Sequence, residues 1–374
     1  MPLCASVHPY TLQFNFEART SRGSMKERKC WFLKLWNSEQ PEVFGLGECA
    51  PLPGLSKETL EEAEGELTMW AGRANGLIWT ITGGGLPEVH SFLNSQHLQP
   101  FCSSVSFAVE AAMLDLLQGG KRIIFQTDFV RGNAIDINGL IWMGGLDYML
   151  QQIDIKIRDG FQCIKMKVGS HNFEKECDIL QYVRRKYFKQ HIVIRLDANG
   201  AFKDDALDKL RALARFDVHS IEQPVKAGSD KMEMLCRESP VPVALDEELI
   251  GVPPNEREAL LTKLKPKHII LKPSLMGGLL ANKEWIALAE KLGIGWWMTS
   301  ALESNVGLNA IAQFTSQYAL TLPQGLGTGS LYTNNIESPL QVAAGKLSHN
   351  IQKHWDLREL FPPANPDDPA FLPE

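Results

Sequence analysis

From about residue 135 onward, short apolar runs alternate with helix-like stretches, and this alternation constrains the fold more than any other feature of the sequence. The runs read DINGLIWMG, CIKMKVG, IVIRLDANG, VHSIEQPV, PVALDE, HIILKPS and GIGWWMTS, and a weaker eighth run lies near YALTLPQGLG. Strands that alternate with helices form βα units, whose strands pair in parallel. The pattern predicts an α/β fold, a (β/α) barrel that is compact for its type. We disfavour an open doubly wound sheet because no Gly-rich dinucleotide or phosphate fingerprint follows these strands.

The first third of the chain has a different pattern, with strands first and helices later. SVHPYTLQFNF and CWFLKLW are typical of strands, and KETLEEAEGELTMWAG has the period of a helix. This order predicts a separate α+β domain. We expect it to span residues 1–132 and the barrel to span 133–332, with residues 333–374 packing against the α+β domain.

Charged residues stand near the ends of five consecutive apolar runs. Lys167, Asp197, Glu222, Asp246 and Lys272 follow one another at steps of 30, 25, 24 and 26 residues. Each step is about one βα unit, so each residue takes the same place in its repeat. The carboxyl ends of barrel strands form the active-site mouth, and we therefore expect these five side chains to converge there.

The three acids of this set indicate a site for a hard divalent cation. Carboxylate oxygens on rigid strand ends suit Mg²⁺, for which Mn²⁺ is an expected substitute. Zinc is disfavoured because no His or Cys falls at these positions. A single acid at a strand end is more often a helix cap or a surface charge. That interpretation does not explain why three acids recur at the same position of successive βα units.

The lysines flank the acids in the chain and are candidates for proton transfer. Lys167 and Lys272 lie on the second and sixth runs, so they could face each other across a bound substrate. Acid–base work requires a lowered lysine pKa, which a cation or another lysine favours and carboxylates oppose. Lys165 lies on the same strand face as Lys167, and we expect it to give structural or electrostatic support rather than to transfer protons. For Lys167 the alternative is a salt bridge to Asp197 or Glu222.

The motifs KMK at 165–167, DANGAF at 197–202, EQP at 222–224, LDEE at 245–248 and LKPS at 271–274 resemble those of the enolase superfamily. The resemblance covers nearly the whole chain. It implies a modified TIM barrel under an N-terminal α+β capping domain. It also implies Asp197, Glu222 and Asp246 as metal ligands, with Lys167 and Lys272 as the acid–base pair. Asn199 and Glu247, which lie within two of the motifs, are expected to support the ligands.

The arrangement of lysines is similar to the branch of muconate cycloisomerases, dipeptide epimerases and o-succinylbenzoate synthases. A His-based branch is disfavoured because WWMTSALES, at the seventh run, holds no His. GECAPLPGLS, INGLIWMG, MTSALESNVGLNAIAQF and GLGTGSLY look most like the last of the three families. The resemblance implies a hydro-lyase acting on a dicarboxylate in menaquinone biosynthesis. The alternatives are an N-succinylamino acid racemase, a dipeptide epimerase, a cycloisomerase and a catalytically silent metal-binding barrel.

The loops around the barrel mouth contain the candidates for substrate binding. TSRGSM at 20–25 and APLPGLS at 50–56 stand where specificity loops of the capping domain belong, and the last two strands end in TSALES and GTGS. Hydroxyls and backbone N–H groups there are expected to bind a second carboxylate, and Trp297 or Met298 to help seat a ring. The candidate residues are Ser21, Arg22, Leu52, Ser300, Ser304, Gly327, Thr328 and Gly329.

Composition narrows the choice of partners. The net charge is −6, which argues against nucleic-acid and anionic-membrane partners, and no apolar run is long enough to span a membrane. The seven cysteines include no C-x-x-C pair, and we see no signal peptide, so a cytoplasmic location is expected. The oligomeric state stays open.

Overall fold

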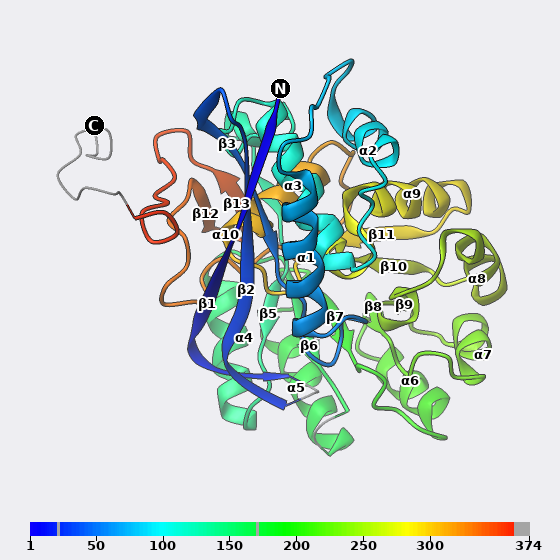
Figure 1. Ribbon diagram of the computed structural model, residues 1–374. Coiled ribbons are helices and arrows are strands. Elements are labelled where there is room, and N and C mark those ends of the chain that lie inside the picture. The colour runs from blue at the N-terminus through cyan, green and yellow to red at the C-terminus, as the bar shows by residue number, and fades with distance from the viewer. Residues whose placement is uncertain (21–22, 170–171, 363–374) are drawn as a thin grey trace.

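The computed structural model describes residues 1–20, 23–169 and 172–362. The chain opens with an antiparallel sheet of order β1-β2-β3, whose strands are Leu3–Thr20, Gly23–Asn37 and Gln40–Cys49. Three helices follow it: α1 (Leu60–Ala74), α2 (Gly85–Ser95) and α3 (Ser103–Leu117). Figure 1 shows this unit in blue and cyan beside the barrel strands.

Helix α3 packs directly on strand β3, and two glycines make this approach possible. A Cβ atom at Gly45 would lie 1.9 Å from the backbone oxygen of Ala112, and one at Gly47 would lie 1.9 Å from that of Ala108. No side chain fits at either position, so glycine is required where the helix crosses the strand.

The second unit is a curled sheet of seven parallel strands in the order β11-β10-β9-β8-β7-β6-β5, with helices around it (Figure 1). The strands are β5 (Gly139–Ile141), β6 (Cys163–Lys167), β7 (Val193–Asp197), β8 (Ser220–Glu222), β9 (Val243–Leu245), β10 (His268–Leu271) and β11 (Gly295–Met298). The helices are α4 (Leu146–Arg158), α5 (Phe173–Lys186), α6 (Ala206–Ala214), α7 (Lys231–Glu238), α8 (Arg257–Leu264), α9 (Gly278–Lys291) and α10 (Asn305–Thr315). The predicted (β/α) barrel with an N-terminal α+β domain is confirmed.

The eighth apolar run does not form a regular strand. Within the described chain, the segment near YALTLPQGLG makes only two isolated parallel bridges, Ile137 with Gln324 and Thr299 with Gly325. These bridges join the two edge strands of the sheet, because Ile137 precedes β5 and Thr299 follows β11. Pro323 and the glycines after it explain the weak pairing, since proline lacks the N–H that a ladder needs. The barrel is therefore thinly closed at residues 324–325, between β5 and β11.

The last part of the described chain contacts both units. Strands β12 (Leu340–Ala343) and β13 (Lys346–His349) form a hairpin that pairs with β4 (Ile135–Asp136). Farther on, Leu360 belongs to the apolar cluster that Phe32 of β2 helps to build. The expected division at residues 132 and 332 stays a prediction.

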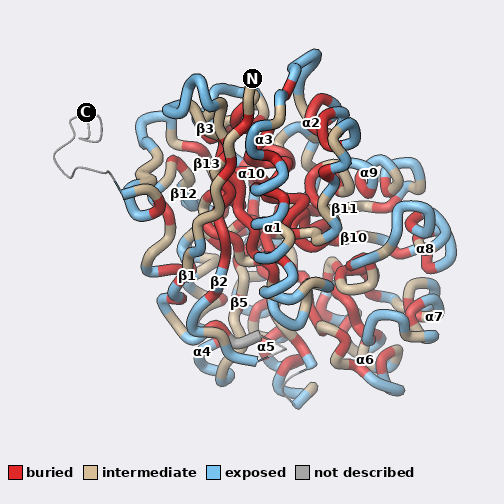
Figure 2. The backbone as a smooth tube through the Cα atoms, viewed as in Figure 1, coloured by how far each residue is buried: buried red, intermediate tan, exposed pale blue. Residues whose placement is uncertain are grey.

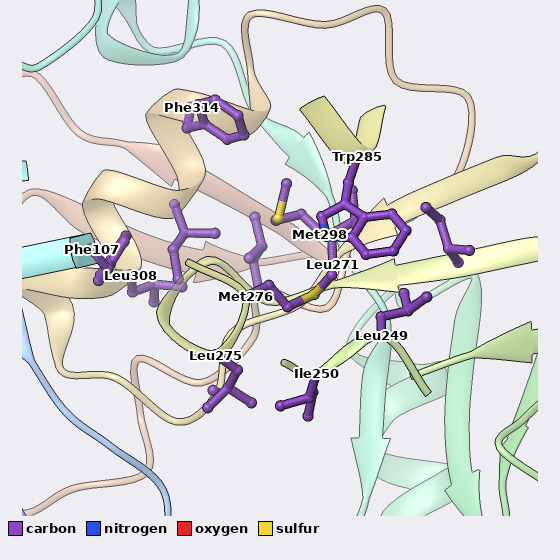
Figure 3. Close-up of a cluster of buried hydrophobic side chains, with 14 of the residues drawn as sticks. Phe107, Leu249, Ile250, Leu271, Leu275, Met276, Trp285, Met298, Leu308 and Phe314 are labelled. Carbon is purple, nitrogen blue, oxygen red and sulfur yellow. The ribbon is translucent and has the colours of Figure 1, made fainter. Parts of the chain in front are cut away.

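Buried apolar side chains join the N-terminal unit to the barrel. Figure 2 shows buried backbone gathered along α3 and α10. Figure 3 shows part of the cluster, in which Phe107 of α3 and Leu308 of α10 lie near Leu275 and Met276, just after β10. This packing fixes the segment that follows Lys272. In the described part of the chain, no helix combines the length and hydropathy needed to cross a membrane.

Candidate active site

Strand register brings the charged residues to one end of the barrel. Lys167 is the register partner of Asp197, and Asp197 is the partner of Glu222 on the next strand. Asp246 directly follows β9 and Lys272 directly follows β10. The five residues of the in-phase series therefore lie on five consecutive strands at their carboxyl ends, as the spacing predicts.

Lys165 lies between two of the acids. Its Nζ atom is 2.6 Å from Glu222 Oε2 and 3.1 Å from Asp197 Oδ2, and its side chain is only 10% exposed. Lys272 forms a similarly buried ion pair with Asp246. Each of these ammonium groups neutralises carboxylates that would otherwise be buried and unpaired. Lys165 thus has the electrostatic contacts that its expected supporting role requires.

The buried charges shift one another's pKa values. Burial raises the pKa of Asp197, but Lys165 and Lys167 outweigh burial and hold it below its usual range. Burial and the neighbouring Asp197 raise the pKa of Glu222 well above its usual range. Burial lowers the pKa of Lys272, but Asp246 and Glu222 reverse that shift and raise it. Glu222 is therefore the acid that most needs a further positive charge in order to ionise.

Lys167 is held more loosely than the other two lysines. Its Nζ atom is 3.7 Å from Asp197 Oδ2 and donates a hydrogen bond to Asn199 Oδ1. Asn199 in turn donates from Nδ2 to Glu247 Oε1 at 3.1 Å. The structure thus joins the two expected supporting residues to each other and to Lys167.

Gln223 of the EQP motif positions Asp246. Its Oε1 atom accepts hydrogen bonds from the backbone N–H groups of Asp246 and Glu248, each at 3.2 Å. Gln223 has φ +41° and Asn199 has φ +42°. This left-handed conformation is uncommon outside glycine and often marks functional loops.

The donor chemistry of the three acids fits a divalent cation. Asp197, Glu222 and Asp246 are at most 3% exposed, and the buried atoms Glu222 Oε1 and Asp246 Oδ1 accept no hydrogen bond in the described structure. Unsatisfied buried oxygens of this kind are ligands that Mg²⁺ prefers. Among the described residues, no three His, Cys, Asp or Glu side chains are gathered into a ready metal-binding group. Lys165 and Lys272 pair with carboxylate oxygens for which a cation would compete.

A cavity of about 590 Å³ opens over these residues. It is lined by all three lysines, by Asp197 and Asp246, and by parts of both expected specificity loops, including Met25 and Leu52. Glu222 lies beneath the lining. Such a volume is ordinary for a site that encloses a small molecule.

The candidate substrate residues divide into three groups. Leu52, Ser300, Gly327 and Thr328 line the cavity. Gly329 and Ser304 lie outside its lining, and the Ser304 hydroxyl caps α10 and donates to Glu48 at 2.5 Å. Ser21 and Arg22 lie outside the described residues. Trp297 and Met298 do not line the cavity, whose apolar wall includes Phe16, Leu140, Trp142 and Leu302.

Comparisons with known proteins agree with this geometry. Residues 149–350 match the family described as Enolase C-terminal domain-like, and residues 4–78 match the one described as MenC, N-terminal domain. An o-succinylbenzoate synthase of Desulfotalea psychrophila is 42% identical over 356 residues, which cover 90% of this chain and 96% of that protein. The chain belongs to the enolase superfamily.

Solved enolase-superfamily structures resemble the whole fold. The crystal structure of MenC from Desulfotalea psychrophila has a TM-score of 0.82 at 39% identity and covers 93% of this chain and 100% of that one. The L-Ala-D/L-Glu epimerase from Bacillus subtilis has a TM-score of 0.79 at 18% identity and covers 93% and 96%. The second likeness shows the fold alone.

Sequence reasoning missed several residues that line the cavity of this enolase-superfamily chain. Arg28 of β2 is 2% exposed and donates to the backbone oxygens of Ala50 and Ala301, which ties the capping sheet to the loop after β11. Asn138 lies just before β5, and its buried Oδ1 atom accepts no hydrogen bond. The polar Asn138 between the apolar residues Ile137 and Leu140 was a usable signal, whereas nothing in the sequence distinguishes Arg28 from the basic residues around it.

Proposed function

We propose that this protein is an o-succinylbenzoate synthase, which dehydrates 2-succinyl-6-hydroxy-2,4-cyclohexadiene-1-carboxylate to 2-succinylbenzoate in menaquinone biosynthesis. The observation that carries the proposal is one cavity lined by Lys167 and Lys272 from strands on either side of the acid-bearing strands. The 42% identity to a relative of that name supports the choice of substrate.

The lysines divide the work in this proposal. Lys167 Nζ takes the proton on the carbon next to the substrate carboxylate, since its ion pair with Asp197 is longer than the ion pairs of Lys165 and Lys272. Lys272 keeps its proton, which its raised pKa favours, and stabilises the negative charge that develops on the substrate. Lys167 then returns the proton to the departing hydroxyl, which leaves as water while the ring becomes aromatic. One base therefore serves both steps.

Three acids would bind the metal cofactor in this proposal. Asp197, Glu222 and Asp246 would hold Mg²⁺, with Mn²⁺ as a substitute. When bound, the cation supplies a Lewis acid for the substrate carboxylate. Asn199 and Glu247 orient Lys167 and the loops that carry the ligands.

The test is a substrate panel with purified protein and Mg²⁺. The cyclohexadiene carboxylate should give the ultraviolet change of an aromatic product, and chelation should abolish it. N-succinylamino acids and dipeptides run beside it, with solvent deuterium followed at the α carbon. Fast exchange on those compounds without dehydration would instead assign a racemase or an epimerase. No turnover of any compound by metal-loaded protein would favour a silent barrel.

A further inference from the structure

Two hydroxyls that line the cavity donate their protons to neighbouring protein groups and not into the cavity. Ser300 Oγ donates to Glu303 Oε2 at 2.5 Å, and Thr328 Oγ1 donates to Ser300 Oγ at 2.8 Å. Ser274 Oγ donates to the other oxygen of Glu303, also at 2.5 Å. A hydroxyl has one proton to donate. Ser300 and Thr328 therefore present only lone pairs to the cavity, and lone pairs do not bind a carboxylate.

The cations of the cavity lining are the strongest remaining side-chain candidates for binding a second carboxylate. Lys165, Lys167 and Lys272 contact the acid cluster. The guanidinium of Arg28 already donates hydrogen bonds to two backbone oxygens. Two cations of the lining remain, Lys29, which is exposed, and Lys156, which is partly buried. Asp159 attracts Lys156, but no ion pair involving Lys156 is found in the described structure.

Lys156 lies on the last turn of α4, beside the thinly closed part of the barrel. Its side chain packs against Gly139 of β5, where an added Cβ atom would lie 3.2 Å from its methylenes. Its Nζ atom is 4.8 Å from the ring centroid of Phe161. Both residues line the 590 Å³ cavity and also an adjoining cavity of about 570 Å³, and Ser330 lines the two as well. Lys156 therefore lies where the walls of the two cavities meet.

The register of the strands gives the distance between Lys156 and the acid cluster, measured along the strands. Gly139 is the register partner of Ile164, three residues before Lys167. Three residues of strand span about 10 Å. The stem of Lys156 therefore lies roughly 10 Å along the strands from the level of the acid cluster, which suits a short aliphatic arm that ends in a carboxylate.

We propose that Lys156 forms an anion subsite that binds the distal carboxylate of the substrate, with the arm lying along Phe161. This inference rests on the proposed function and deepens it by placing the second carboxylate. Charge-assisted hydrogen bonds to partly buried lysines are strong enough to affect KM markedly. Because Lys156 touches no reacting atom in this arrangement, its loss should weaken binding and leave kcat almost unchanged.

The experiment compares Lys156→Met with Arg158→Met, which removes an exposed cation two residues farther along the same helix. With Mg²⁺ and the cyclohexadiene carboxylate, Lys156→Met should raise KM by roughly 10- to 100-fold with kcat within about threefold. Arg158→Met should match the parent, and Lys156→Arg should recover most of the affinity. A KM for Lys156→Met within about twofold of the parent would overturn the subsite.

A binding measurement separates this proposal from the proposed function. Calorimetric titration of Mg²⁺-loaded protein uses 2-succinylbenzoate and 2-butyrylbenzoate, which lacks the distal carboxylate. The parent should prefer the first, and Lys156→Met should lose that preference. An unchanged preference would overturn the subsite whether or not the parent dehydrates its substrate. Lys156→Gln serves as a second variant if Lys156→Met melts at a much lower temperature than the parent.

Discussion

The ammonium group of Lys165 lies 2.6 Å from the carboxylate of Glu222, and both side chains are almost completely buried. Lys165 also reaches Asp197, so one lysine neutralises two acids beneath the cavity. Isolated buried charges are costly, whereas a cation placed between two acids lowers that cost for both. In the proposed function, Mg²⁺ is a second source of positive charge for the same carboxylates.

Replacing Lys165 should therefore destabilise the metal-free protein. Lys165→Met leaves two buried acids without their cation, and the free energy of unfolding should fall by about 3–5 kcal/mol. Added Mg²⁺ should restore part of the loss, because it supplies charge to the same oxygens. Denaturant unfolding with and without Mg²⁺ measures both effects. As a control, Lys186→Met removes a surface pair with Asp154 at the same 2.6 Å distance and should cost far less. Equal losses in the two variants would show that burial of the pair is unimportant.

Removing one proposed ligand should weaken metal binding. Asp246→Asn keeps the size of the side chain but removes its negative charge, and the Kd for Mg²⁺ should rise at least about tenfold. Calorimetric titration of the purified variant with MgCl₂ gives this value directly. Asp208→Asn, at an exposed acid paired with Arg211, should bind Mg²⁺ like the parent. Unchanged affinity in Asp246→Asn would mean that another residue is the ligand.

Lys167 and Lys272 should respond differently to substitution. Lys167→Ala should reduce kcat by at least about 100-fold, because the proposed reaction needs this base at both proton transfers. The variant should still fold, since the ion pair of Lys167 is longer than those of Lys165 and Lys272. Lys272→Arg keeps the charge but changes its shape, and it should lose much of the activity too. Steady-state dehydration rates and thermal melts test the pair, and full activity in Lys167→Ala would exclude the mechanism.

The sequence was most informative where charged residues recur with the period of the βα units. Charged residues at steps of one βα unit predicted that Lys167, Asp197 and Glu222 would lie at the same end of the sheet, and they are register partners. The period of the pattern is sufficient to predict this common end, because parallel strands with similar connections end at the same edge of the sheet.

The contacts of individual side chains could not be read from the pattern. The pattern allowed Lys165 either to repel Lys167 or to pair with acids, and only the packed strands place its Nζ atom between Asp197 and Glu222. Lys156 reads as an ordinary basic residue at the end of a helix, a position that the helix dipole favours. Its access to the cavity depends on the missing eighth strand, which is a long-range property of the fold.

The close approach of α3 to β3 gives a test of the capping unit. Gly47→Ala would place a Cβ atom against the backbone of Ala108, so we expect a loss of at least roughly 2 kcal/mol in the free energy of unfolding. Gly65→Ala, on α1, has nothing within 4 Å of the new methyl group and should stabilise the protein by about 0.5–1 kcal/mol. Denaturant melts of both variants measure the difference, and losses of the same size would contradict the packing argument.

Two histidines predict how stability changes with pH. His219 and His268 stack with ring centroids 5.0 Å apart, and each ring also lies against Trp297. Burial, followed by the positive charge of Arg195, lowers the pKa of His219 to about 4. Burial, followed by the charges of His219 and Arg195, lowers the pKa of His268 to about 4. Both rings are therefore neutral in the folded protein at pH values where the unfolded chain already binds protons.

The sign of the effect follows from this difference. The stability that these histidines contribute is complete above pH 6.5, the ordinary histidine value, and is lost as the pH falls from there toward about 4. His268→Asn should flatten this part of the stability curve relative to the parent, because one of the two depressed groups is gone. Urea unfolding at intervals between pH 4 and pH 7 measures the two slopes. His97→Asn, at an exposed turn residue whose backbone oxygen accepts from Arg73, is the control and should keep the parent slope. Parallel curves for His268→Asn and the parent would show that the stacked pair does not resist protonation.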